Sequence, residues 1–274
     1  MKRELATFLI GYLSGKDTAM PGTPTPLAIR YAVKSDTGLE REGNEDAAYA
    51  GPRLLAVADG LGGHAAGEVA SAAAIEALRS LDTDVPAGEL LNVLERAVRQ
   101  ANATLHDMVE ADPSLLGMGT TLTGIMWSGS QLGLVHIGDS RAYLLRDGEL
   151  FQITHDHTVV QSLIDDGRIT PEEATSHPQR SMLLKALGGG SAEPDLQLRD
   201  ARPGDRYLLC SDGLYEVVPV DAIARVLSDV AEPDEGVAAL VDLANQAGGP
   251  DNITCIIADV LPLNDPAGAP TVNG

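Results

Sequence analysis

The sequence predicts an α+β fold built on antiparallel sheets, and three of its features favour this class. Strand-like and helix-like segments are both frequent among the 274 residues, but they do not alternate as a doubly wound parallel sheet requires. Residues 121–145 contain three short apolar segments that are predicted antiparallel strands, with Gly129-Ser130 and Asp147-Gly148 as hairpin turns. Residues 86–112 carry apolar side chains at helical spacing, which indicates a long amphipathic helix packed on the core.

The other elements follow from apolar runs and from the residues that bound them. The last two predicted helices each begin at an acidic residue, Asp221 or Asp234, which we expect to act as the N-terminal cap. The further strands are expected at 28–33, 54–58, 206–210 and 253–260, and the further helices at 67–81, 221–227 and 234–247.

The segment 154–187 differs from its surroundings, because it is polar and rich in His, Asp and Ser. Its pattern predicts mostly helix, with Thr170 and Glu173 placed as a capping box at one helix start. We expect it to be a mobile flap. Its histidines, His155, His157 and His177, are interpreted as surface or capping residues.

Composition bounds the domain organisation and excludes several function classes. An apolar share of 44% is enough for a sizeable core, and we expect a flexible leader at 1–27, one domain at 28–261 and a disordered tail at 262–274.

The formal net charge of −21 disfavours nucleic acid as a partner. No segment has the length and apolarity of a membrane span. Cys210 and Cys255 lie in apolar runs and are expected to be core thiols, which suits a reducing, cytoplasmic location.

Four aspartates stand at the ends of predicted strands. Asp59 follows the run 54–58, Asp139 follows the strand near 132–137, Asp212 follows 206–210, and Asp251 precedes the last strand. Strand ends on one rim of a sheet can converge, and converging carboxylates require a neutralising cation. Oxygen ligands favour Mg²⁺ or Mn²⁺ over zinc. Each aspartate alone is better explained as a turn residue or a helix cap, but the full set is not.

The residues that follow Asp59 include further groups suited to binding a ligand or taking part in a reaction. Gly60 leaves the backbone open to close approach, and His64 stands just before a predicted alanine-rich helix. A carboxylate, an exposed backbone and a histidine together at one strand end favour a reactive site at the edge of the sheet. The alternative is a strand that simply ends in a glycine turn.

The order of the motifs resembles that of the metal-dependent protein phosphatases of type 2C, the PPM family. The likeness covers roughly residues 28–260 and is strongest to the bacterial Ser/Thr phosphatases of the family, through the segments 136–141 and 166–173. A single motif of this kind is weak evidence, whereas the ordered set is specific. The matching motifs are Arg41-Glu42-Gly43-Asn44-Glu45-Asp46, Ala58-Asp59-Gly60-Leu61-Gly62-Gly63-His64, Gly119-Thr120-Thr121, Gly138-Asp139-Ser140-Arg141, Cys210-Ser211-Asp212-Gly213-Leu214 and Gly249-Pro250-Asp251-Asn252.

The resemblance implies a four-layer αββα sandwich, with two central antiparallel sheets flanked by helices, and a cleft that holds two Mn²⁺ or Mg²⁺ ions and a third, looser ion. It also implies a role for each matching residue. Asp59 would bridge the metals, Gly60 would offer its carbonyl, Asp212 and Asp251 would hold the second metal, Asp139 would help to hold the third, and Glu45 and Asp46 would act through bound waters.

The implied reaction is hydrolysis of phosphoserine and phosphothreonine by a metal-activated water. Arg41 would bind the phosphate, and His64 would protonate the leaving oxygen. Arg141 is interpreted as a structural ion-pair partner. The expected substrates are phosphorylated proteins, Ser/Thr kinases among them, and the expected state is a monomer.

Two other functions use the same residues. A metal-dependent phosphodiesterase or nuclease could employ these carboxylates, although the sequence has no basic stripe. A degenerate phosphatase that only binds phosphoproteins would need a missing ligand, yet Asp59, Asp212 and Asp251 are all present.

Overall fold

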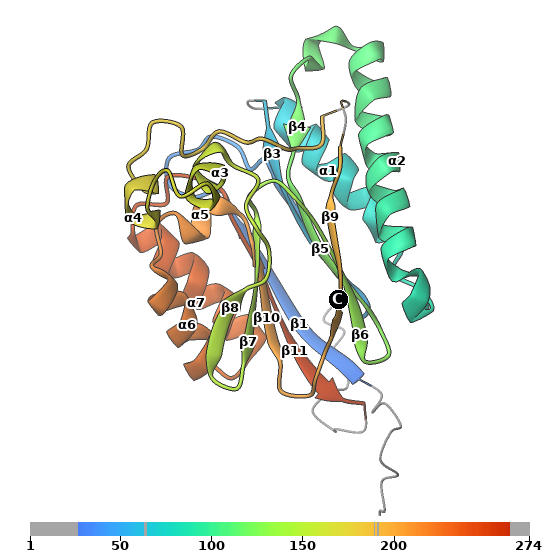
Figure 1. The fold of residues 1–274 in the computed structure, drawn as a ribbon, viewed down its shortest axis with the longest axis vertical. Coiled ribbons are helices and arrows are strands. Elements are labelled where there is room, and N and C mark those ends of the chain that lie inside the picture. Colours follow the sequence, from blue (N-terminus) through green and yellow to red (C-terminus); the bar gives the residue numbers. More distant parts are fainter. Residues whose placement is uncertain (1–26, 63–64, 189, 191, 264–274) are drawn as a thin grey trace, which may run out of the picture.

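The computed structural model describes residues 27–62, 65–188, 190 and 192–263. They form four layers, in which two antiparallel sheets lie face to face and helices cover both outer faces (Figure 1). The predicted α+β class and four-layer αββα sandwich are therefore confirmed. The predicted leader and tail lie almost entirely outside the described residues.

The first sheet has the order β1-β11-β10-β7-β8, and the second has the order β2-β3-β5-β6-β9, with β4 paired to β3. The strands are β1 (Leu27–Asp36), β2 (Asp46–Ala50), β3 (Leu54–Leu61), β4 (Gly119–Thr120), β5 (Leu122–Ser128), β6 (Gln131–Ile137), β7 (Arg141–Arg146), β8 (Glu149–Gln152), β9 (Asp195–Asp200), β10 (Arg206–Cys210) and β11 (Ile253–Pro262).

The helices divide between the two outer layers and the loops at one end of the sandwich. Helices α1 and α2 pack on the second sheet, whereas α6 and α7 pack on the first (Figure 1). The helices are α1 (Ala65–Arg79), α2 (Leu90–Ala111), α3 (Val159–Asp165), α4 (Pro171–Ala174), α5 (Asp212–Tyr215), α6 (Val220–Asp229) and α7 (Pro233–Gln246), with short 3-10 turns at Ala87–Glu89 and Pro113–Leu115.

Strand β3 shows why the sequence gives this layering. Leu54, Ala56 and Ala58 point toward the helices α1 and α2, while Leu55 and Val57 point into the space between the sheets. Side chains alternate between the two faces of a strand, so an uninterrupted apolar run buries both faces. This explains why the run carries no polar alternation.

The structure confirms several local predictions. Asp147 and Gly148 both have positive φ, at 54° and 82°, in the β7–β8 hairpin turn. Thr170 and Glu173 form the predicted capping box of α4. The long helix begins at Leu90, after a 3-10 turn, and buries most of its predicted stripe.

Other local predictions were wrong. Residues 154–187 contain only the short helices α3 and α4 and are otherwise loop, and β9 was not anticipated. Asp221 and Asp234 lie in the first turns of α6 and α7, where their charge suits the helix dipole, but they are not the caps. No described helix is both long enough and apolar enough to span a bilayer.

Candidate active site

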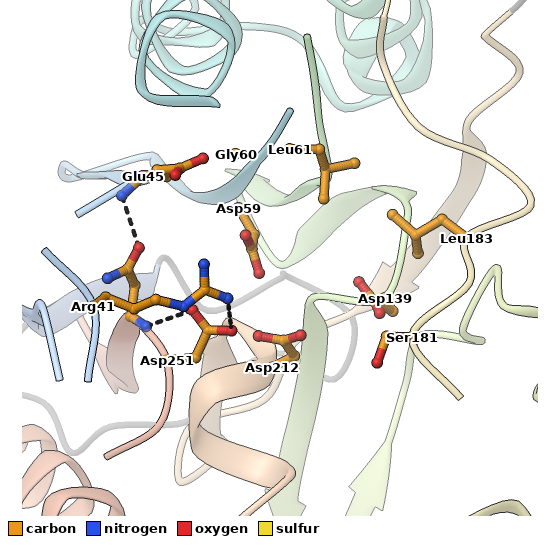
Figure 2. A pocket seen from close by; sticks show the side chains of 11 residues that line it. Arg41, Glu45, Asp59, Gly60, Leu61, Asp139, Ser181, Leu183, Asp212 and Asp251 are labelled. Atoms are coloured by element: carbon orange, nitrogen blue, oxygen red, sulfur yellow. Dashed lines mark hydrogen bonds and ion pairs between the residues drawn. The ribbon is translucent and has the colours of Figure 1, made fainter. Parts of the chain in front are cut away.

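A cavity of about 120 Å³ opens where the two sheets meet. Figure 2 shows four aspartates that converge on it from separate parts of the chain. The residues that line it are Arg41, Glu45, Asp59, Gly60, Leu61, Asp139, Ser181, Leu183, Asp212, Asp251 and Asn252.

Both sheets contribute to this lining. Asp59 belongs to β3 of the second sheet, whereas Asp212 begins α5 directly after β10, and Asp251 lies just before β11 of the first sheet. Asp139 stands in the turn that leads from β6 in one sheet to β7 in the other. The fold thus gathers residues as far apart in the sequence as Arg41 and Asn252.

A fifth aspartate stands directly beside Asp59. Asp46 begins β2 and is the register partner of Asp59 across the β2–β3 pair. One of its oxygens accepts a hydrogen bond of 2.7 Å from the hydroxyl of Ser211, while Oδ1 is buried without a protein partner. Like charges placed directly opposite each other destabilise a sheet. This pair therefore calls for a cation beside it.

Burial raises the pKa values of these carboxyl groups. It moves the pKa of Asp59 well above its ordinary range, with repulsion from Asp212 as the next cause. It also raises the pKa of Asp212 well above its ordinary range, with repulsion from Asp139 as the next cause. Burial, then the charge of Asp156, raises the pKa of Asp139 to about 7. Burial raises the pKa of Asp46 to about 6. The cluster is thus costly to ionise without a counter-charge.

Arg41 brings a positive charge to the rim of the cavity. Its Nη2 donates a hydrogen bond of 2.6 Å to Oδ2 of Asp251, and its side chain remains half exposed (Figure 2). The loop that carries Arg41 is held by Asn252, whose amide nitrogen donates to the carbonyl oxygens of Thr37 and Gly43, both at 2.9 Å. The amide oxygen of Asn252 also accepts from the backbone nitrogen of Glu45 at 2.8 Å.

Gly60 allows the backbone crossing that shapes the cavity wall. A Cβ at this position would lie 2.3 Å from the carbonyl oxygen of Gly67 and 2.6 Å from that of Glu45. Strand β3 continues through Asp59 and Gly60 to Leu61, because its last residues pair with β4. Asp59 was expected at the strand end and instead lies inside the strand.

The structure brings most of the predicted site residues together. Arg41, Glu45, Asp59, Gly60, Asp139, Asp212 and Asp251 line the cavity, and Asp46 lies next to Asp59. His64 lies outside the described residues. Sequence reasoning missed Asn252 as the residue that fastens the Arg41 loop, although it adjoins Asp251 in a quoted motif. It also missed Ser181 and Leu183, which no local pattern singles out.

Of two neighbouring residues, one differs from its predicted role and the other has the role that was predicted. His157 was interpreted as a surface or capping residue, but it is buried, and its Nδ1 accepts a hydrogen bond of 3.1 Å from the backbone nitrogen of Gly138. Arg141 makes the expected structural ion pair, and its partner is Asp156, with Nη2 and Oδ2 2.6 Å apart.

The donor set of the cavity suits a hard divalent cation. The side-chain donors are carboxylate oxygens, which Mg²⁺ and Mn²⁺ prefer. A cation would stabilise both the unpartnered oxygen of Asp46 and the opposed pair of Asp46 and Asp59. Among the described residues, no three His, Cys, Asp or Glu groups are drawn close enough together to hold an ion as they stand. The residues thus fit such ions in chemistry and charge, with side-chain adjustment needed to enclose them.

The sandwich and its carboxylate cavity define a class of protein. The family model described as protein phosphatase 2C matches residues 42–246, and the chain belongs to that family.

Within the family, the chain is similar to named bacterial phosphatases. It is 59% identical over 235 residues to the serine/threonine protein phosphatase PstP of Mycobacterium tuberculosis, covering 86% of this chain and 46% of that protein. The chain therefore spans about half the length of this relative. The serine/threonine phosphatase stp of Listeria monocytogenes is 35% identical over 236 residues, covering 82% of this chain and 94% of that protein.

Solved structures show the same likeness. The crystal structure of the M. tuberculosis phosphatase PstP/Ppp matches with a TM-score of 0.83 and 59% identity, over 85% of this chain and 98% of that one. The catalytic domain of PstP in complex with two manganese ions matches with a TM-score of 0.81 and 56% identity, over 86% of this chain and 99% of that one. The bacterial branch indicated by the motifs is thus confirmed.

Proposed function

We propose that this chain is a metal-dependent protein phosphatase that hydrolyses phosphoserine and phosphothreonine in proteins. The observation that carries the proposal is the convergence of Asp59, Asp139, Asp212 and Asp251, from both sheets, on one cavity with Arg41 at its rim. The names of the relatives support the same activity, as serine/threonine phosphatases.

We propose Mn²⁺ or Mg²⁺ as the cofactor, because the donors are oxygen atoms and a similar structure contains two manganese ions. A bound pair of such ions supplies a nucleophilic water at neutral pH and neutralises phosphoryl oxygens. In this proposal the ions are held by Asp59 with the Gly60 carbonyl, Asp212 and Asp251, with Asp139 for a third ion and Glu45 and Asp46 acting through waters.

The chain's own residues then orient and protonate the substrate. Arg41 would release Asp251 and bind the phosphate through a guanidinium whose parallel N–H groups match two phosphoryl oxygens. The serine or threonine oxygen is a poor leaving group and needs a proton, which we assign to His64. Cys210 has no catalytic task, because it is fully buried and burial raises its thiol pKa to about 12.

The substrate class is phosphorylated proteins, Ser/Thr kinases among them. Nucleic acid is disfavoured, since a net charge of −21 repels a phosphate backbone. The two unpaired, buried thiols support a reducing compartment, for which we propose the cytoplasm, and we propose a monomer.

The proposal is tested by turnover of a phosphothreonine peptide with Mn²⁺, with a chelator and with Asp212→Asn. We expect turnover to be lost in chelator and in the variant. Asp221→Asn, at an exposed site on α6, is the matched control and should behave as wild type. Hydrolysis of a phosphodiester in preference to the peptide would instead support a phosphodiesterase, and binding without turnover would support a degenerate phosphatase.

The role of His64 has a separate test. His64→Ala should slow hydrolysis of a phosphothreonine peptide more than that of p-nitrophenyl phosphate, because the nitrophenolate leaves without a proton. Equal losses on both substrates would remove His64 as the acid.

A further inference from the structure

Asp139 and Asp212 are held in the same cavity although their charges repel each other. Asp212 is the first residue of α5, and Asp139 stands in the β6–β7 turn. Each contributes to the electrostatic cost of ionising the cluster, and two carboxylates so placed tend to move apart unless the backbone restrains them. A contact that joins their two segments would oppose this separation.

Tyr215 provides a direct link between these segments. Its phenol donates a hydrogen bond of 3.0 Å to the backbone carbonyl oxygen of Asp139. Tyr215 is also the last residue of α5, three positions after Asp212, so the two side chains lie on neighbouring parts of one helical turn. A single hydroxyl thus joins the helix that carries Asp212 to the turn that carries Asp139.

The ring of Tyr215 is itself fixed in place. The guanidinium carbon of Arg141 lies 3.6 Å from the ring centroid, which is the geometry of a cation–π contact. Arg141 is in turn held by both oxygens of Asp156, at 2.6 to 3.1 Å, and its Nη1 donates to the hydroxyl of Tyr143 at 3.2 Å. The phenol of Tyr215 therefore has little freedom to leave Asp139.

Resting on the function proposed above, we propose that Tyr215 is a positioning residue. It holds the Asp139 turn against the Asp212 helix and thereby sets the affinity of the cavity for the divalent cation that Asp139 helps to bind. The charges of Asp139 and Asp212 both act on the Tyr215 phenol, but its hydrogen bond goes to the Asp139 backbone, so its effect on cation binding passes through that backbone.

Tyr143 offers a matched control on the same guanidinium. It is a buried tyrosine of β7 whose hydroxyl contacts Arg141 and, within the part of the chain that the structure describes, forms no hydrogen bond with Asp139. Tyr215→Phe and Tyr143→Phe each remove one phenolic oxygen and leave a ring in place. Any effect that travels only through Arg141, or through general loosening of the fold, appears in both variants.

The experiment is Mn²⁺ titration of the whole chain, followed by the electron paramagnetic resonance signal of free Mn²⁺, without any substrate. We expect Tyr215→Phe to weaken Asp139-dependent binding about 2- to 10-fold, as the loss of one ordinary hydrogen bond implies. Tyr143→Phe should bind as wild type. In an Asp139→Asn background, Tyr215→Phe should have no further effect on the remaining binding.

Three results with the variants would overturn the proposal. They are unchanged Mn²⁺ binding in Tyr215→Phe, an equal loss in Tyr143→Phe, and an undiminished effect of Tyr215→Phe when Asp139 is already Asn. Absence of any Asp139-dependent Mn²⁺ binding in the wild type would also overturn it. Because the titration requires no turnover, a chain that binds Mn²⁺ as expected but hydrolyses no phosphopeptide would refute the proposed function alone.

Discussion

Replacing Asp139 with Asn should stabilise the chelated protein at alkaline pH, although it damages the active site. Asp139 is only 8% exposed, and burial together with Asp156 raises its pKa to about 7, against an ordinary 3.8. The difference corresponds to about 4 kcal/mol of unfolding free energy. Because the native pKa is raised, this stability is fully present below about pH 4 and is lost as the pH rises through about 7.

Asn carries no charge at any pH, so the variant should keep the stability that wild type loses. The assay is urea unfolding of both proteins in chelator at about pH 4 and about pH 8. We expect similar free energies at the lower pH and an advantage of up to about 4 kcal/mol for Asp139→Asn at the higher. Saturating Mn²⁺ should shrink or reverse that advantage, because the cation supplies the missing charge. An equal difference at both pH values would refute the reasoning.

Three other perturbations have defined outcomes. Arg41→Lys keeps the charge but loses the forked donor, so kcat/KM for a phosphopeptide should fall about 10- to 100-fold, and an unchanged value would remove Arg41 from phosphate binding. Gly60→Ala should lower the free energy of unfolding by about 1–3 kcal/mol, measured by urea denaturation, because its Cβ would lie 2.3 Å from the Gly67 carbonyl oxygen; wild-type stability would contradict this close approach. Burial lowers the pKa of His136 to about 4, so the free energy of unfolding should fall by about 3 kcal/mol as the pH falls from about 6.5 to 4. Urea titrations should show that His136→Asn lacks this pH dependence of stability.

Much of the fold could be predicted because its signals are local. The apolar run of β3, the Asp147-Gly148 turn and the stripe of α2 each follow from side-chain periodicity or backbone preference. The helix content of residues 154–187 and the role of His157 were mispredicted because polar residues there bond to the body of the protein, as His157 does to Gly138. Strand β9 was missed because its pairing with β6 joins segments far apart in the sequence.

The carboxylates of the site could be named from sequence, but their arrangement could not. The position of each acid relative to a strand end was readable for Asp139, Asp212 and Asp251, and the ordered motifs indicated that they act together. The register that sets Asp46 opposite Asp59 is a property of strand pairing and cannot be predicted from the sequence of either motif. The link from Tyr215 to Asp139 likewise depends on tertiary contact alone.

The supply of carboxylates from both sheets has a mechanical consequence. An ion shared by Asp59 and Asp212 would act as a staple between the two halves of the sandwich, resisting any sliding of one over the other. Packing between the two sheets, such as the edge-on contact of Trp127 with Tyr207 at a centroid distance of 5.8 Å, would then also resist this sliding. Substitutions at such remote positions can therefore change how rigidly the two sheets hold the metal-binding aspartates, although the substituted residues do not contact the site.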